Sequence, residues 1–381
     1  MTSITDRLRP AVGATYSFSH RQRSRRWLEL VSLGARVRRF LAEPFDNDVR
    51  AFAAHKARCH ETLWTSAAAS VAAAIDDLGY GVYRIARGGR ETFVSSSRVM
   101  LDGPVTLSIA GNKPLVSRIL SEHGHPVGRF LEFDLSEIDL AESFLERLGG
   151  PGVVKPAISG SAGRGITTGI ETRRDLRRAS VLASTYGKTM LIEQQATGAS
   201  YRLLYIDGEY IDAIERRPPR VVGDGRHTLA QLIRTENLRR REGLAPLGMQ
   251  PIGIDLELRR CLAGQGLTLS SVAEPDRWVT VKAVVNENTA AENSNVRDRV
   301  HPDTIRRGAE IARVLKIRLA GHDVITTDIS RPLDETGGIF NEVNTTPGLL
   351  HHYLIDHPEQ TVPVMERLLE VLLAPGEWPR S

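Results

Sequence analysis

The chain has 381 residues with a hydrophobic content of 41%, which is enough for an ordinary globular core divided over two or three subdomains. Its 50 basic and 46 acidic residues leave a net charge of only +4, too small and too dispersed to indicate a nucleic-acid partner. The sequence has no apolar run of the ~18 residues that span a bilayer, no signal-peptide core, and no metal or redox spacing around Cys59 and Cys261, so we expect a cytoplasmic protein with no membrane partner.

Residues 1–105 are expected to form a small helical and α/β region in front of the main fold. Apolar residues in the range 27–41 recur at helical spacing, with arginines opposite, and predict a helix. Its basic face is interpreted as solvated, with attraction of an acidic ligand or partner as the alternative. The alanine-rich residues 67–78 predict a second helix, and residues 80–94 predict a strand hairpin.

Residues 106–192 are expected to form a first lobe. Asn112 is placed to cap a helix that starts at Lys113, because an asparagine side chain accepts hydrogen bonds from the free amides of a first helical turn. The apolar residues 153–156 predict a strand, and residues 189–193 predict another, which ends on a glutamate.

Residues 193–381 are expected to form a second lobe that is richer in strands. Residues 201–206 and 210–215 are separated by an Asp-Gly pair and predict a hairpin. Two further strands are predicted at residues 321–328 and 337–344.

A glycine-rich loop directly follows the strand that carries Lys155. Glycines let backbone amides close on phosphate oxygens, and a lysine adds a point charge, so the segment predicts a phosphate site. Lys113 is a second cation for the same phosphates. The loop matches neither of the two common nucleotide-binding motifs, so the folds that use them are disfavoured. The loop residues expected to bind phosphate are Gly160, Ser161, Gly163, Arg164 and Gly165.

Residues 340–348, FNEVNTTPG, set Glu342 and Asn344 two positions apart. The period of two in a strand turns both side chains to one face. Their oxygens suit Mg²⁺, which takes one or two carboxylates and completes its shell with water and phosphate oxygens, so a nucleotide is implied. The third oxygen ligand is either Asp323 or Asp328, and the strand period favours Asp323.

The order of these parts resembles the ATP-grasp ligases, and more narrowly the ATP-grasp module of cyanophycin synthetase and of glutathione-synthetase-type ligases. The resemblance covers roughly residues 100–375 and rests on many separate motifs in the right order. It implies an α+β fold in which two lobes grip ATP. The matching motifs are Gly163-Arg164-Gly165, Tyr201-Arg202-Leu203-Leu204, Glu215-Arg216, Val222-Gly223-Asp224-Gly225, His301-Pro302 and Glu342-Val343-Asn344.

The resemblance also implies roles for individual residues. The phosphates would be held by Lys113 and Lys155. The adenine site would be lined by Glu193, Gln194 and Gln195. The catalytic residues facing the transferring phosphoryl group and the substrate carboxylate would be Arg202, Arg216 and Lys155. One or two Mg²⁺ would be bound by Asp323, Glu342 and Asn344. The candidates for substrate binding are Arg216, Arg220, Asn286 and His352.

The sequence departs from the family at Ala162, Ser200 and Ala290-Ala291, where substrates are selected, so the polymer-forming substrates are not transferred. We expect an ATP-dependent carboxylate–amine ligase that uses ATP and Mg²⁺, joins small amino-acid-like substrates through an acyl phosphate, and releases ADP, phosphate and one discrete amide. A homo-oligomer remains open. The alternatives are an ATP-grasp enzyme that modifies a protein or peptide, and a non-catalytic nucleotide-binding partner protein.

Overall fold

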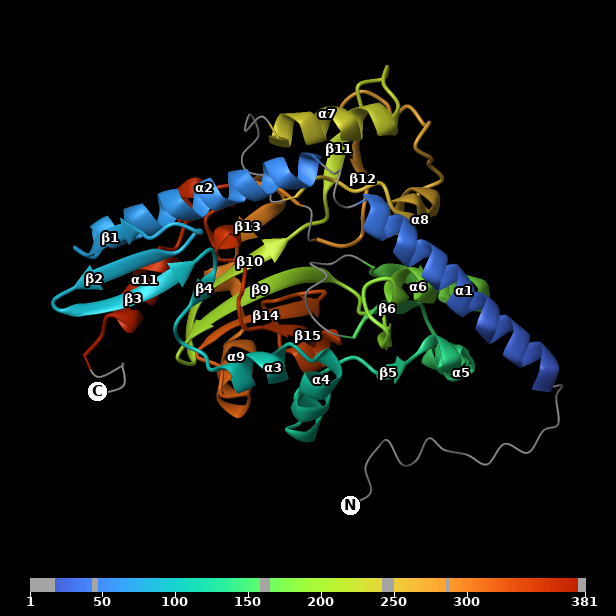
Figure 1. The fold of residues 1–381 in the computed structure, drawn as a ribbon, viewed down its shortest axis with the longest axis horizontal. Helices are drawn as coiled ribbons and strands as arrows, with labels where there is room; N and C mark the ends of the chain where they lie inside the picture. Colours follow the sequence, from blue (N-terminus) through green and yellow to red (C-terminus); the bar gives the residue numbers. More distant parts are fainter. Residues whose placement is uncertain (1–17, 43–46, 158–164, 242–249, 286–287, 376–381) are drawn as a thin grey trace.

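The computed structural model describes residues 18–42, 47–157, 165–241, 250–285 and 288–375 (Figure 1). Two long helices and a small sheet come first, and two larger sheets with their helices follow. None of the helices described is long and apolar enough to cross a membrane. The expected division at residues 105 and 192 stays a prediction.

The N-terminal region consists of two helices and an antiparallel sheet in the order β1-β2-β3-β4. The predicted helix over residues 67–78 is confirmed only for residues 67–70, the end of α2, and is wrong beyond Ser70, because residues 74–77 form a strand that pairs with β2. This pairing in a hairpin with β2 overrides the helical propensity of the alanines. The elements are α1 (Phe18–Ala42), α2 (Asn47–Ser70), β1 (Ala74–Asp77), β2 (Tyr83–Arg87), β3 (Arg90–Ser95) and β4 (Arg98–Val99).

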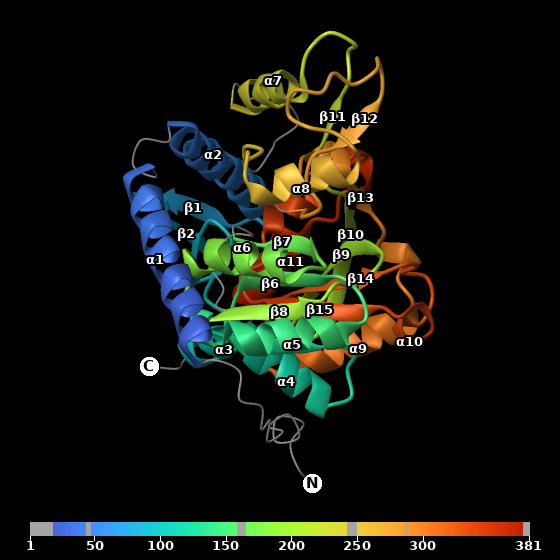
Figure 2. The same cartoon turned by 90° about the vertical axis from the view of Figure 1, so that its right-hand side faces the viewer.

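The predicted helix near residues 27–41 is confirmed as α1, but much of its apolar stripe is exposed. Leu28 and Ser32 are buried, whereas Trp27 and Leu30 are 62% and 67% exposed. Arg36 donates two hydrogen bonds to the carbonyl of Ser184, at 2.6 and 3.0 Å, so the helix packs through a small polar contact. Figure 2 shows α1 lying along α6, with which it is in contact.

The central lobe contains a four-stranded antiparallel sheet in the order β5-β8-β6-β7. Asn112 caps α4 as predicted, since its side chain accepts a hydrogen bond from the amide of Leu115 at 3.0 Å. The elements are α3 (Pro104–Ala110), α4 (Lys113–Glu122), β5 (Phe130–Phe133), η3 (Leu135–Glu137), α5 (Ile138–Leu148), β6 (Gly152–Pro156), β7 (Thr167–Ile170), α6 (Arg173–Ser184) and β8 (Met190–Gln194).

The C-terminal lobe is built on a five-stranded sheet in the order β13-β10-β9-β14-β15. Its elements are β9 (Ala199–Ile206), β10 (Glu209–Arg216), η4 (Ala290–Glu292), β13 (Asn293–Asn295), η5 (Arg297–Arg299), α9 (Pro302–Val314), β14 (Leu319–Thr326), α10 (Leu333–Thr336), β15 (Ile339–Asn344), η6 (Leu349–His352), η7 (Pro358–Gln360) and α11 (Val364–Leu372). An insertion between β10 and η4 has a small core of its own. It contains β11 (Arg220–Val222), α7 (Leu229–Arg241), α8 (Leu256–Gly264) and β12 (Trp278–Thr280).

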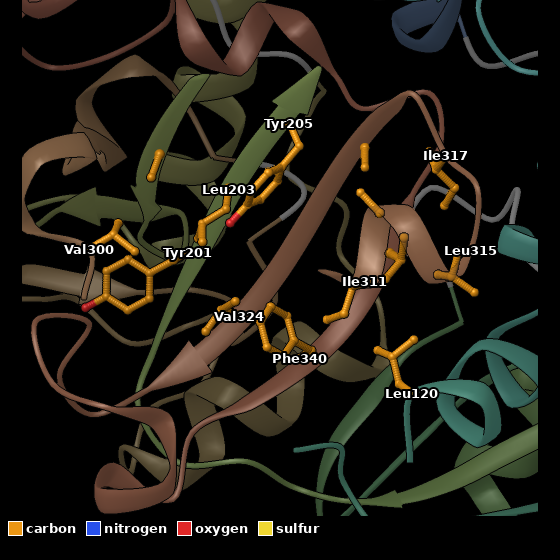
Figure 3. Packing of buried hydrophobic residues seen from close by; sticks show 14 of the residues in the cluster. Leu120, Tyr201, Leu203, Tyr205, Val300, Ile311, Leu315, Ile317, Val324 and Phe340 are labelled. Carbon is orange, nitrogen blue, oxygen red and sulfur yellow. The ribbon is translucent and has the colours of Figure 1, made fainter. Parts of the chain in front are cut away.

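The five-stranded sheet separates two apolar cores because neighbouring residues of a strand point to opposite faces. On β9, Leu203 and Tyr205 belong to the core shared with α9, part of which is seen in Figure 3. Leu204 and Ile206 belong to the core shared with α2 and α11. The N-terminal helix α2 therefore covers the second face of this sheet.

Candidate active site

Polar side chains from four neighbouring strands share the face of the sheet that α2 covers in part. Arg202 lies on this face because it precedes Leu204 by two positions on β9. Asp323 on β14 is opposite Arg202, and Glu342 on β15 is opposite Asp323. Arg216 follows Ile214, which is opposite Arg202 on β10. The sheet thus brings Arg216, Arg202, Asp323 and Glu342 into one row.

Arg202 and Asp323 form a buried bidentate ion pair. Nε of Arg202 donates to Oδ1 of Asp323, and Nη2 donates to Oδ2 at 2.8 Å. Burial alone would raise the pKa of Asp323, but the positive charge of Arg202 outweighs it and the pKa lies below its ordinary value. Asp323 is therefore a carboxylate in the folded protein, and Arg202 is held in a fixed position.

Arg216 differs from Arg202 because no described carboxylate pairs with it. Arg216 is 5% exposed, its Nη2 donates to the carbonyl of Val285 at 3.1 Å, and its Nε has no hydrogen-bond partner among the described residues. Burial first, and the charge of Arg202 second, lower its pKa to about 10. A buried cation with spare donors favours an anionic ligand, which would satisfy both its charge and its hydrogen bonds.

The two lysines predicted to bind phosphate both approach carboxylates at the site. Nζ of Lys113, in the first turn of α4, lies 3.3 Å from Oε1 of Glu342. Nζ of Lys155, on β6, lies 2.7 Å from Oε1 of Glu193 on β8. Each lysine therefore has an acidic partner that a bound anion would have to share or replace.

The predicted Mg²⁺ ligands come together on β14 and β15. Asp323 and Glu342 face each other, and Asn344 is opposite Gly321, to whose carbonyl its Nδ2 donates at 3.4 Å. Asp328 lies beyond the end of β14 and accepts hydrogen bonds from the amide and hydroxyl of Ser330, at 2.9 and 2.7 Å. Two carboxylates and an amide oxygen fit Mg²⁺, which is also bound by phosphate and water.

Within the described ranges, no group of three or more His, Cys, Asp or Glu side chains is arranged to hold a metal. The donor set proposed above contains only two carboxylates, so it depends on phosphate oxygens to complete it. Position 321, next to these ligands on β14, requires a glycine, because a Cβ at Gly321 would lie 2.6 Å from Cβ of Pro347. Because Gly321 has no Cβ, Pro347 in the turn after β15 can pack closely on the sheet next to Arg202.

The residues predicted to line the adenine site lie at the end of β8. Oε1 of Gln194 accepts a hydrogen bond from Nε of Arg129 at 3.2 Å, and Oε1 of Gln195 accepts one from the amide of Gly169 at 2.7 Å. The second bond ties the end of β8 to β7, the strand that returns from the glycine-rich loop.

Of the loop residues, Gly160, Ser161, Gly163 and Arg164 fall outside the described part of the chain. Gly165 is described, with φ of +79°, and a Cβ there would lie 2.6 Å from the ring of Tyr186. Only glycine fits this end of the loop.

The remaining substrate-binding candidates are dispersed. Arg220 lies over the ring of Trp278 in the insertion, at 4.3 Å from the ring centroid. Asn286 falls outside the described residues. His352 is fully buried, and its Nδ1 shares a hydrogen bond of 2.6 Å with Oδ2 of Asp212 on β10. Their roles in substrate binding stay predictions.

Two residues near Arg216 were missed by the motifs. His351 is buried, and its Nδ1 has no hydrogen-bond partner among the described residues. Its pKa lies well below the ordinary value, first through burial and then through nearby cations that include Arg216 and Lys56. Lys56 belongs to α2, far away in the sequence, so no local pattern connects it to the site.

The two antiparallel sheets with their covering helices are those of the ATP-grasp fold. No protein-family model matches the sequence. The chain is 32% identical over 286 residues to a cyanophycin synthetase of Crocosphaera subtropica, covering 74% of this chain and 32% of that protein. It is 27% identical over 260 residues to the glutathione biosynthesis bifunctional protein GshAB of Mannheimia succiniciproducens, covering 66% of this chain and 34% of that protein.

Among solved structures, a bifunctional glutathione synthetase from Pasteurella multocida superposes with a TM-score of 0.50 and 21% identity, over 79% of this chain and 41% of that one. The chain thus spans about a third of the length of the curated relatives it matches. These comparisons, with the sheet topology, confirm the predicted α+β ATP-grasp fold and the resemblance to both groups of ligases.

Proposed function

We propose that the chain is an ATP-dependent carboxylate–amine ligase acting on small molecules. The observation that carries the proposal is the row of Arg216, Arg202, Asp323 and Glu342 on one sheet face, with Lys113 beside Glu342. Such a row offers cations for anionic substrates and carboxylates for Mg²⁺ in the same place. The similarity to cyanophycin synthetase and to glutathione biosynthesis proteins supports the same chemistry.

When bound, ATP with Mg²⁺ supplies the phosphoryl group that activates a carboxylate. Lys113, Lys155 and the loop that ends at Gly165 would hold the phosphates, and Asp323, Glu342 and Asn344 would supply the oxygen ligands of the metal. Arg202, fixed by Asp323, orients the group in transfer, and Arg216 holds the substrate anion. Because these groups sit in a buried row, their charges act more strongly than they would in water.

The expected products are ADP, phosphate and a single amide. We assign the enzyme to the cytoplasm, in agreement with two free thiols at Cys59 and Cys261. The carboxylate and amine are small, as for the amino-acid-like substrates considered from the sequence.

The proposal is tested by a screen of the purified chain with ATP, Mg²⁺ and pairs of amino acids and small acids. We expect ADP release that requires one carboxylate. With hydroxylamine in place of the amine, we expect a hydroxamate, because hydroxylamine intercepts an acyl phosphate. Release of AMP and pyrophosphate would refute this mechanism, and ADP release only with a protein or peptide acceptor would favour the alternative. Mass spectrometry of the product distinguishes one amide from a polymer ladder.

A further inference from the structure

Helix α8 of the insertion contacts the central lobe through Arg260. Figures 1 and 2 both show α8 beside α6, and α8 is also in contact with β7. Nη1 of Arg260 lies 2.8 Å from Oδ1 of Asp175 on α6. Its Nε donates to the carbonyl of Thr168 at 3.3 Å, and its Nη2 donates to the carbonyl of Gly169. Every nitrogen of the guanidinium therefore bonds to the central lobe.

The two carbonyls belong to a bulge in β7. The register of β6 and β7 shifts here, so that Thr168 and Gly169 lie opposite the single residue Val153. Gly169 has φ of +63°, a left-handed conformation that bulges often assign to glycine. A bulge disrupts the ladder of hydrogen bonds, and β7 is also the edge strand of its sheet. The polar groups of this bulge therefore take partners from outside the sheet.

The peptide group between Thr168 and Gly169 is held at both ends. Its carbonyl accepts the hydrogen bond from Nε of Arg260, and its amide donates to Oε1 of Gln195 at 2.7 Å. Hydrogen bonds at the two ends of one peptide group polarise it and strengthen each other. Because Gln195 follows β8 at the predicted adenine site, a series of hydrogen bonds connects the insertion, β7 and the adenine side of the site.

The same guanidinium is anchored to a fixed carboxylate. Asp175 lies in the first turn of α6, and its Oδ2 accepts a hydrogen bond from the hydroxyl of Thr172 at 2.8 Å. β7 begins two residues after Gly165, the described end of the glycine-rich loop. Since the insertion follows β10 of the C-terminal lobe, the rigid fork of Arg260 sets the position of β7 relative to that lobe.

We propose that Arg260 is a positioning residue for nucleotide binding. It holds the bulge of β7, so that Gly165 and Gln195 keep the spacing that ATP requires between the phosphate side and the adenine side of the site. The inference rests on the proposed function, which places ATP between the two lobes. Arg260 acts through the Thr168–Gly169 peptide group and not by contact with ATP. The insertion thereby contributes to ATP affinity.

The test measures nucleotide binding and turnover separately. Isothermal titration calorimetry of the full chain with ADP and Mg²⁺ gives Kd without turnover. Arg260→Gln should weaken ADP binding roughly 3- to 30-fold, the range in which residues that do not contact a ligand change its affinity. The half-saturating ATP concentration should rise by the same factor, while kcat at saturating ATP stays within about twofold of wild type, because uniform binding is lost.

Two controls separate this role from a general loss of structure. Arg259→Gln makes the same change at the next position of α8, where the side chain is exposed, and should bind ADP like wild type. The double variant of Arg260→Gln and Gln195→Leu should bind ADP within about twofold of the weaker single variant, because both changes act on one peptide group.

The Arg260 side chain is 27% exposed, so its variants are expected to fold, which a circular dichroism melt checks. Arg260→Lys is measured in the same way. It keeps the charge beside Asp175 but loses the planar fork, so it should weaken ADP binding in the same direction and by a smaller factor.

The inference is overturned if the folded Arg260→Gln and Arg260→Lys proteins bind ADP as tightly as wild type, or if Arg259→Gln weakens binding equally. It is also overturned if the losses from Arg260→Gln and Gln195→Leu multiply in the double variant, or if the wild type binds no ADP.

Failure of the ligase proposal looks different. In that case no pair of acid and amine releases ADP, although Arg260→Gln still weakens ADP binding, and the inference stands. Ligase turnover in Arg260→Gln with the nucleotide affinity of wild type would retain the ligase and reject the inference.

Discussion

The two faces of the five-stranded sheet use the same strands for different purposes. On the face toward α9, Leu203, Tyr205 and Val324 are buried in an apolar core, and His322 is fully buried with them. On the opposite face, Leu204 packs against α2 and α11, but Arg202, two positions earlier, begins the charged row. A strand's alternation allows this, since each face can be selected independently.

The two faces differ in what they contribute, because the apolar face stabilises the fold and the charged face carries the groups of the candidate site. The apolar face gains its stability from burial, which also lowers the pKa of His322 and favours its neutral ring. The charged face buries an ion pair, which adds little stability compared with apolar packing, and an unpaired guanidinium, which costs stability. We therefore expect substitutions on the apolar face to lower stability, and to lower activity only as far as the protein unfolds. Substitutions on the charged face should change activity in the folded protein.

The largest effect is expected for Glu342→Gln. This change removes the negative charge of a proposed Mg²⁺ ligand and should lower ADP release at least about 10²–10³-fold, by analogy with the loss of one electrostatic group in an active site. Its ion pair with Lys113 is partly exposed, so the melting temperature should change little. The control is Glu335→Gln, an exposed acid on α10, which should have wild-type activity. Wild-type ADP release by Glu342→Gln would reject the metal assignment.

The two neighbouring arginines of the charged face should respond oppositely when their stability is measured. Arg202→Leu leaves Asp323 buried without its partner and should cost about 3–5 kcal/mol of unfolding free energy. Arg216→Leu removes a buried charge that has no carboxylate partner in the described part of the chain, and it should leave the unfolding free energy unchanged or higher, while ADP release falls. Denaturant unfolding of both variants measures the difference. Equal destabilisation would mean that Arg216 is paired in the folded protein.

Local patterns predicted most of this sheet from the sequence. The Asp-Gly pair between residues 201–206 and 210–215 predicted the hairpin of β9 and β10, and the placement of Glu342 and Asn344 two positions apart on a strand is confirmed on β15. The strand period also favoured Asp323, which the structure places opposite Glu342, with a bulge only after it. These features are local because strand geometry depends on neighbouring residues.

Features that depend on the partner of a segment, and not on its own composition, were wrong or missed. Residues 74–77 are a strand because they pair in a hairpin with β2, which outweighs their helical composition. The apolar stripe of α1 is exposed because Leu28 and Ser32, not Trp27 and Leu30, contact the central lobe. Helix α2 packs through Cys59 and Leu63 on the core of Leu350 and Leu354, and no spacing in the sequence indicates that contact.

On the apolar face, His322 should make stability depend on pH. Burial lowers its pKa from 6.5 to about 4. Above about pH 6.5 the ring is neutral in both states, but between 6.5 and 4 the unfolded chain binds a proton that the folded protein does not. Stability should therefore fall as the pH is lowered through this window, by on the order of 3 kcal/mol in total.

The measurement is the unfolding free energy of wild type and His322→Gln at several pH values between 7 and 4. Glutamine keeps a donor for the carbonyl of Gly308, which lies 3.0 Å from Nε2 of His322, but it does not titrate. We expect a shallower pH dependence in the variant. Parallel curves for the two proteins would show that His322 is not the titrating group.

The smallest effect is expected for Tyr205→Phe, which tests whether the apolar face is independent of the reaction. The Tyr205 hydroxyl donates a hydrogen bond to the carbonyl of Ile305 at 3.1 Å and faces α9, on the side of the sheet away from Arg202. Removing it should cost about 1 kcal/mol of unfolding free energy, because one buried neutral hydrogen bond is lost and the ring is kept. Since the next residue, Leu204, faces the other core, the charged row should not move. The rate of ADP release should therefore equal that of wild type at 25 °C, where both proteins are folded. A fall in rate of tenfold or more, with the variant still folded, would mean that the two faces are coupled through the strand and that stability and function are not divided between them.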